Sequence, residues 1–149
     1  MATGQFTVSA QNQTISTAIT ILELTVQSGA AIFITGAWIS AGTTTAGTAR
    51  IQLLKKSGTV TGTATPPTPV MTNGTGSSGI TVKWKATAEG TDGGIIREYN
   101  FRLDGGDVYW LPIPQGQIFV GAGGIIAMKF PGAPASNSYS FGFEYTEYV

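Results

Sequence analysis

Carboxylates are the main candidates for acid–base chemistry in this 149-residue chain, because it contains neither histidine nor cysteine. Their absence removes the commonest general base, thiolate nucleophiles, disulfides and cysteine-bound metals. A glycosidase needs two carboxylates that face each other across a cleft. All eight carboxylates here fall in predicted turns or on predicted solvent-facing strand positions: Glu23, Glu89, Asp92, Glu98, Asp104, Asp107, Glu144 and Glu147. The sequence therefore predicts a protein that is not an enzyme.

Two glycine-containing turns resemble ligand loops, and ordinary turn chemistry accounts for both. Residues 121–124 (GAGG) look like a phosphate loop, but the Lys-Ser/Thr pair and the helix that would follow are missing. Asp104 and Asp107 could approach a calcium ion, but two carboxylates are few for a hard cation. We expect no cofactor and no metal.

Aromatic residues offer a second kind of site, a platform on which a sugar could stack. The candidates are Trp38, Trp84, Trp110, Tyr99, Tyr109 and Tyr139. Most of them lie on the apolar face of their own predicted strand, where large aromatic side chains normally fill a core. Trp110, two residues before Pro112, is the best exception, and we take Trp110 and Tyr109 as the candidate exposed aromatics.

The charge balance argues against nucleic acid and membrane partners. Eight basic residues balance eight acidic ones, so no net field would steer the chain towards a polyanion. The start has no secretory signal pattern, and the longest apolar stretch, residues 29–39, is about half of what a membrane-spanning helix needs. We expect synthesis in the cytoplasm. The basic pairs Lys55–Lys56 and Lys83/Lys85 are expected on solvated strand faces.

Alternating apolar and polar residues predict strands throughout the chain, with no sustained helical period. The predicted strands cover residues 6–9, 19–26, 31–39, 50–56, 80–88, 95–103, 109–111, 118–120, 125–130 and 139–148. Gly36 is expected at a bulge or a close backbone approach. This pattern favours one all-β domain over residues 1–149, an antiparallel β-sandwich with the jelly roll as first choice.

Turn residues suggest how neighbouring strands pair. The segment 89–94 is expected to join strands 80–88 and 95–103 as a hairpin, with Lys83 or Lys85 facing Glu98. The glycines at 121–124 are expected to join strands 118–120 and 125–130 in the same way. Pro112 and Pro114 remove backbone donors, so they confine the strand at 109–111 to an edge or a bend.

Two polar segments are candidates for contact with a partner. Residues 1–5 are expected to form a flexible arm, and residues 57–79 a long Gly/Pro/Thr-rich loop that is either flexible or reserved for contact. The candidate contact residues in these segments are Thr3, Gln5, Pro66, Pro67, Pro69 and Met71.

The layout of the chain resembles the tailed-bacteriophage capsid decoration (cement) proteins. The resemblance rests on residues 6–16 (FTVSAQNQTIS), 50–56 (RIQLLKK), the long loop, 110–114 (WLPIP), 125–130 (IIAMKF) and the final alternating strand. It implies a β-sandwich that forms homotrimers on the outside of the head and bridges subunits of the major capsid protein. The implied location is the virion, on the capsid exterior.

Two other functions remain open. A glycan- or receptor-binding module of a phage tail or fibre would need Trp110 or Tyr109 exposed in a shallow groove. A hydrolase would need two carboxylates that converge in a pocket.

Overall fold

The computed structural model describes residues 2–42, 46–104, 107–113 and 117–149. Within these ranges the chain forms eleven strands and no helix. They are β1 (Gly4–Ile15), β2 (Thr20–Val26), β3 (Ala31–Ala41), β4 (Thr48–Lys56), β5 (Val70–Met71), β6 (Ile80–Trp84), β7 (Asp92–Arg102), β8 (Tyr109–Trp110), β9 (Ile118–Val120), β10 (Ile125–Lys129) and β11 (Asn137–Tyr148). Pro114 lies outside the described residues.

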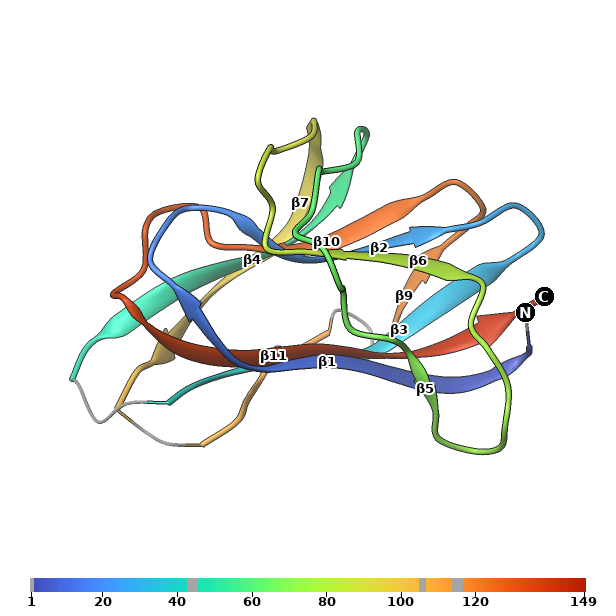
Figure 1. Ribbon diagram of the computed structural model, residues 1–149, viewed down its shortest axis with the longest axis horizontal. Coiled ribbons are helices and arrows are strands. Elements are labelled where there is room, and N and C mark those ends of the chain that lie inside the picture. Colours follow the sequence, from blue (N-terminus) through green and yellow to red (C-terminus); the bar gives the residue numbers. More distant parts are fainter. Residues whose placement is uncertain (1, 43–45, 105–106, 114–116) are drawn as a thin grey trace.

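The strands form two antiparallel sheets that pack face to face (Figure 1). Sheet A has six strands in the order β5-β1-β11-β3, with β8 and β9 both paired to the free side of β3. Sheet B has five strands in the order β6-β2-β10-β4-β7. The predicted all-β antiparallel sandwich is confirmed, whereas the jelly-roll topology stays a prediction.

The core lies between the sheets and follows the alternation in the sequence. On β11 the inward side chains Tyr139, Phe141, Phe143 and Tyr145 are at most 1% exposed, as their spacing predicts. Burial of each large apolar side chain contributes about 1.5–3 kcal/mol relative to leaving it exposed. The inward half of the prediction is confirmed. Of the predicted outward positions, Glu144 is exposed and Ser138 is half-buried, whereas Ser140 and Gly142 are buried.

Gly36 lies where the prediction expected a bulge. The register between β3 and β11 shifts there: Gly36 pairs with Glu144, and the next pair joins Ile34 to Tyr145. Thr35 is thus the extra residue of the bulge. A Cβ atom at Gly36 would lie 3.2 Å from the Trp110 ring, so the backbone approach is close as well.

The first predicted hairpin is wrong. β6 pairs with β2 and β7 pairs with β4, which places the two strands at opposite edges of sheet B. Glu98 consequently lies opposite Gln52, and Lys83 lies opposite Glu23. Alternation identifies the face on which a side chain lies, but it does not identify the partner strand.

The second predicted hairpin is correct as a turn and wrong as a pairing. The Gly124 amide donates to the Gly121 carbonyl at 2.9 Å, and Gly123 takes a φ of 76°, which a side chain would strain. However, β9 belongs to sheet A and β10 to sheet B, so this turn carries the chain between sheets. β8 lies at the edge of sheet A, as Pro112 predicts.

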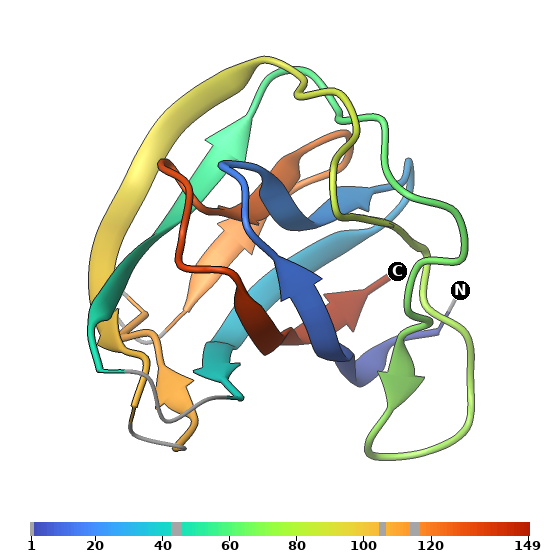
Figure 2. The ribbon, with the colours of Figure 1, turned by 60° about the vertical axis from the view of Figure 1, so that its left-hand side comes forward.

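Residues 57–79 are an ordered strap rather than a free loop, and we call them the 57–79 strap. β6 ends at Trp84, because Lys85 takes a φ of 45°, and the residues after it pair with the strap instead of extending the strand. Thr61 forms a bridge with Ala88, and the Thr63 amide donates to the Trp84 carbonyl at 2.9 Å. The strap then crosses from sheet B to β5 in sheet A (Figures 1 and 2).

Two fully buried carboxylates hold the ends of the strap. Glu23 accepts hydrogen bonds from the Thr59 hydroxyl and, at 3.2 Å, from the Val60 amide. Glu147 accepts from the Ser78 hydroxyl at 2.5 Å and from the Gly79 amide at 2.7 Å. The expectation that both carboxylates face solvent is wrong: the strap covers Glu23, which alternation places on the outer side of β2, and Glu147 continues the inward-facing positions of β11.

We expect Glu147→Ala to destabilise the fold by about 2–4 kcal/mol, since it leaves buried donors at Ser78 and Gly79 without a charged acceptor. Urea unfolding monitored by fluorescence measures this change, and limited proteolysis should show faster cleavage within the strap. Glu144→Ala on the same strand is the matched control and should change stability by less than about 0.5 kcal/mol. Equal effects of the two substitutions would contradict the role of Glu147.

Candidate functional site

The structure gathers the predicted contact segments at one edge of sheet A. Gln5 lies in β1, where its amide donates to Asn73 at 2.9 Å and its carbonyl accepts from the Thr72 amide at 2.8 Å. The Thr3 hydroxyl accepts from the Val149 amide at 3.2 Å. A flexible arm over residues 1–5 is therefore wrong for Gly4 and Gln5, which are part of β1; Met1 lies outside the described residues.

The remaining predicted contacts lie in the strap where it approaches this edge. Pro66 is exposed, while Pro67 and Pro69 are half-buried. Met71, in β5, is half-buried and packs against the core. Beside it, Val70 is 60% exposed, and the sequence analysis did not single it out because a two-residue strand has no readable alternation. Gln5 of β1 and the strap residues Val70, Met71, Thr72 and Asn73 form what we call the β5–β1 edge.

The candidate exposed aromatics, Trp110 and Tyr109, lie at the opposite edge of the same sheet, and only Trp110 is exposed. Trp110 is 51% exposed and lies beside Trp38, with 6.4 Å between ring centres. Tyr109 is half-buried and stacks on Phe101 at 6.2 Å, so it belongs mainly to the interior. The expectation that most aromatics fill the core is confirmed for Tyr99 and Tyr139.

A second aromatic group on the outer face of sheet A was missed by the sequence analysis. Phe119 is 53% exposed and Tyr148 is 49% exposed. Both contact Phe33, at 5.1 and 5.7 Å between ring centres. β9 has only three residues, so its alternation does not show that Phe119 points outward. The pairing of Phe119 with Phe33 places it on the outer face of sheet A.

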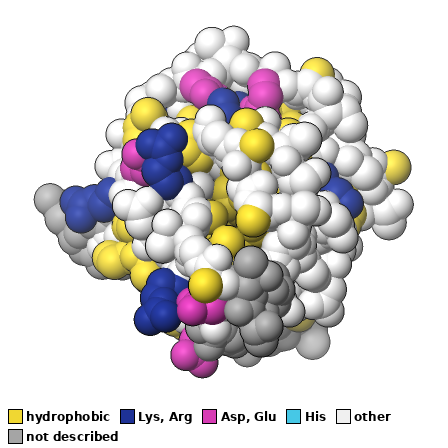
Figure 3. Space-filling model, turned by 90° about the vertical axis from the view of Figure 1, so that its left-hand side faces the viewer, with side chains coloured by type: hydrophobic (Ala, Val, Ile, Leu, Met, Phe, Trp, Pro, Cys, Tyr) yellow, Lys and Arg dark blue, Asp and Glu magenta, His cyan; other side chains and the backbone are white. Residues whose placement is uncertain are grey.

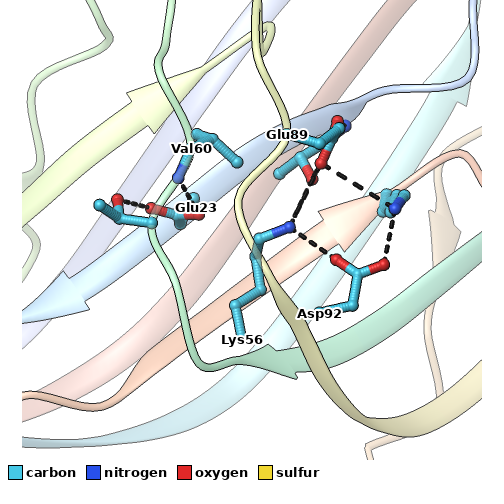
Figure 4. A network of polar contacts seen from close by, with 8 residues as sticks. Glu23, Lys56, Val60, Glu89 and Asp92 are labelled. Atoms are coloured by element: carbon cyan, nitrogen blue, oxygen red, sulfur yellow. Dashed lines mark hydrogen bonds and ion pairs between the residues drawn. The ribbon is translucent and has the colours of Figure 1, made fainter.

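One cluster of ionisable side chains lies on sheet B, at the turn before β7 (Figure 4). The ammonium of Lys56 is buried between Glu89 at 3.2 Å and Asp92 at 2.7 Å. Lys129 pairs with Asp92 at 2.7 Å, and the Thr20 hydroxyl donates to Glu89 at 2.6 Å. The expectation of a solvated Lys56 is wrong, because this turn folds back over the strand that carries it.

The contacts in this cluster favour the ionised forms of Lys56, Glu89 and Asp92. Burial opposes the charge on Lys56, but hydrogen bonds to Asp92 and Glu89 outweigh it and raise the pKa of the lysine. Burial likewise disfavours ionised Glu89, yet donation by Thr20 and Lys56 lowers its pKa. Bonds from Lys129 and Lys56 lower the pKa of Asp92 against the same effect. These three groups therefore provide neither a protonated acid nor a neutral amine at neutral pH, and we call the cluster a structural clamp.

Two of the other carboxylates pair with arginines at the surface. Asp104 accepts from Arg102 at 3.1 Å, and Glu98 lies 3.7 Å from Arg50. On the end of the molecule drawn in Figure 3 most of the surface is uncharged, and acidic and basic side chains lie next to one another.

Two further properties concern the described part of the chain alone. No group of three or more acidic residues there is placed to hold a metal ion. The same residues contain no helix that is both long and apolar enough to cross a membrane.

We expect the clamp to make stability depend on pH at both extremes. Because the pKa values of Glu89 and Asp92 are lowered, their ionisation stabilises the fold above about pH 4, and this stabilisation disappears as acid protonates them. Because the pKa of Lys56 is raised, its charge stabilises the fold at lower pH, and this contribution disappears only above about pH 10. Glu89→Gln should lower stability at pH 7 and flatten its fall between about pH 5 and pH 2.5 in urea unfolding. The control Glu98→Gln should keep the full slope, and identical slopes for both variants would contradict the prediction.

Comparison with known proteins adds no relative: no protein-family model, curated protein or solved structure matches the chain. The capsid decoration family therefore stays a resemblance of layout, and the function has to be argued from the fold and its surfaces.

Proposed function

We propose that this chain is a virion structural protein, a decoration or cement protein that binds the outer surface of a phage head and stabilises the lattice of the major capsid protein. The observation that carries the proposal is the β5–β1 edge. Two segments that the sequence marked for contact, far apart in the chain, lie side by side there, with Gln5 bonded to Thr72 and Asn73. A rigid sandwich thus presents them as one surface.

This edge has the properties of a docking surface for another protein. Val70 exposes an aliphatic side chain, and β5 is an edge strand whose outer side is open to pairing with a further chain. A strand of two residues offers only a small contact. Decoration of a symmetric lattice suits such a contact, because many copies repeat it.

The order of strands supports a jelly roll. Without the outermost strands β5 and β6, sheet A reads β1-β11-β3 followed by β8 and β9, and sheet B reads β2-β10-β4-β7. β1, β2, β3 and β4 alternate between the sheets, and so do β9, β10 and β11, as expected when two Greek keys share one sandwich. Viral capsid domains are a common use of this architecture, which supports the proposed role by analogy of fold alone.

The proposal includes a homotrimer on the capsid exterior, made in the host cytoplasm, without nucleic acid, membrane, metal or cofactor, and without catalytic activity. Three copies around one axis would present the β5–β1 edge three times to neighbouring capsid subunits. The clamp around Lys56 supports a passive role, since each of its charges is engaged by an opposite one.

We expect Val70→Glu to lower the affinity for phage heads that lack this protein by at least about tenfold, because the new carboxylate would lose its hydration on docking. Co-sedimentation with heads measures the affinity. Ile95→Glu is the matched control, since Ile95 is 58% exposed on β7 and Val70 is 60% exposed. Binding that Val70→Glu leaves intact would exclude this edge, and a chain found on tails or on no particle would overturn the proposal.

We expect the purified chain to form trimers in solution at micromolar concentration. Sedimentation equilibrium should give three times the chain mass, and the Val70→Glu variant should remain trimeric if the edge serves the capsid alone. A monomer at all accessible concentrations would contradict the trimer without excluding attachment to heads.

A further inference from the structure

The two indoles on the outer face of sheet A lie over glycines. Trp38 pairs across the sheet with Gly142, where a Cβ atom would come within 2.8 Å of the indole nitrogen. Trp110 extends over Gly36, where a Cβ atom would come within 3.2 Å of the ring. Larger residues at these positions would displace the rings, so the glycines hold both indoles against the sheet while half of Trp110 stays open to solvent.

A carboxylate lies next to the exposed indole. The position of a Cβ atom at Gly36 would also be 3.2 Å from a carboxyl oxygen of Glu144, so Glu144 and Trp110 approach the same point. Glu144 is exposed, and among the described residues no lysine or arginine pairs with it. This acceptor therefore remains open for a ligand.

Glu144 and Thr35 also line a cavity of about 370 Å³ on the same face, which lies within the ordinary range for small-ligand sites. Trp110 is not among its lining residues, so Glu144 is the side chain that joins the cavity to the indole. Hydroxyl and amide side chains provide most of the remaining polar lining: Thr7, Thr72 and Gln5. These groups are uncharged and can each donate and accept hydrogen bonds.

The register of sheet A places this polar row between two aromatic rows. One aromatic row runs across the strands through Gly142, Trp38 and Trp110. The other row runs through Thr146, Phe33 and Phe119. Thr7, Glu144 and Gly36 form the row between them. A fitting ligand has a flat apolar face for a ring and a rim of hydroxyls for the polar row.

We propose that this face is a saccharide-binding site, in which the C–H face of a pyranose packs on Trp110 while its hydroxyls bond to Glu144 and Thr35. This combination is how concave sites recognise neutral polyols: aromatic area supplies affinity, and a few placed polar groups fix the orientation. An apolar protein segment would leave the open carboxylate without a partner, which is costly once water is excluded. The inference goes beyond attachment to a capsid and does not depend on it.

The test uses the full-length protein with two sets of probes. Methyl pyranosides of glucose, galactose, mannose and N-acetylglucosamine represent free sugars, and purified bacterial lipopolysaccharide represents a surface polysaccharide. Saturation-transfer NMR and tryptophan fluorescence should detect at least one of them. Trp110→Ala and Glu144→Gln should each weaken that binding by at least about tenfold. The controls Trp84→Phe and Glu98→Gln, both on sheet B, should bind like the unchanged protein.

Binding of none of these probes would overturn the inference, and so would binding that survives both Trp110→Ala and Glu144→Gln. A protein-docking role would show itself differently: Trp110→Ala would reduce binding to phage heads while no sugar binds. If Trp110→Ala and Glu144→Gln lose sugar binding while attachment to heads is unchanged, the saccharide site is established independently of the decoration role. Urea unfolding of each variant confirms that it is folded.

Discussion

The arrangement of this molecule depends on two carboxylates that are buried and must keep their hydrogen bonds. A polar group withdrawn from water is tolerated only when it keeps hydrogen-bond partners, and Glu23 and Glu147 find these partners at the two ends of the strap. The strap is therefore held where it leaves sheet B and where it returns from β5. Because β5 is part of this segment, the edge that we propose for docking is as well defined as the sandwich itself.

The ion clamp around Lys56 also fixes a connecting segment, the turn before β7. Its charges hold the residues before β7 against sheet B, next to the place where the strap begins, since the amides of Ser57 and Gly58 donate to the Thr91 carbonyl. Burying a lysine between two carboxylates adds little net stability compared with an apolar side chain, but removing one partner is costly. Such clamps favour one arrangement of the chain over others, which suits a protein whose proposed task is to present a fixed surface.

The edge and the outer face of sheet A present different kinds of side chain. The β5–β1 edge exposes aliphatic side chains and strand backbone, whereas the middle of the outer face of sheet A combines indoles, hydroxyls and an open carboxylate. Glycines at positions 36 and 142 create the second surface, because only residues without a Cβ atom allow the indoles to lie so close to the sheet. The two surfaces meet at Gln5 and Thr72, which belong to the edge and also line the cavity, whereas Trp110 lies at the opposite edge of the sheet.

The sequence by itself determined the class of fold, the inward face of β11, the bulge at Gly36 and the exposure of Trp110, because each follows from alternation, glycine or proline within a few residues. The pairing of strands was decided only by the tertiary structure: β6 and β7, neighbours in sequence, lie at opposite edges of sheet B. The same holds for Glu23 and Lys56, whose positions alternation marks as solvated. The physical reason is that alternation reports which side of a strand a residue occupies, whereas burial also depends on which distant segment later covers that side.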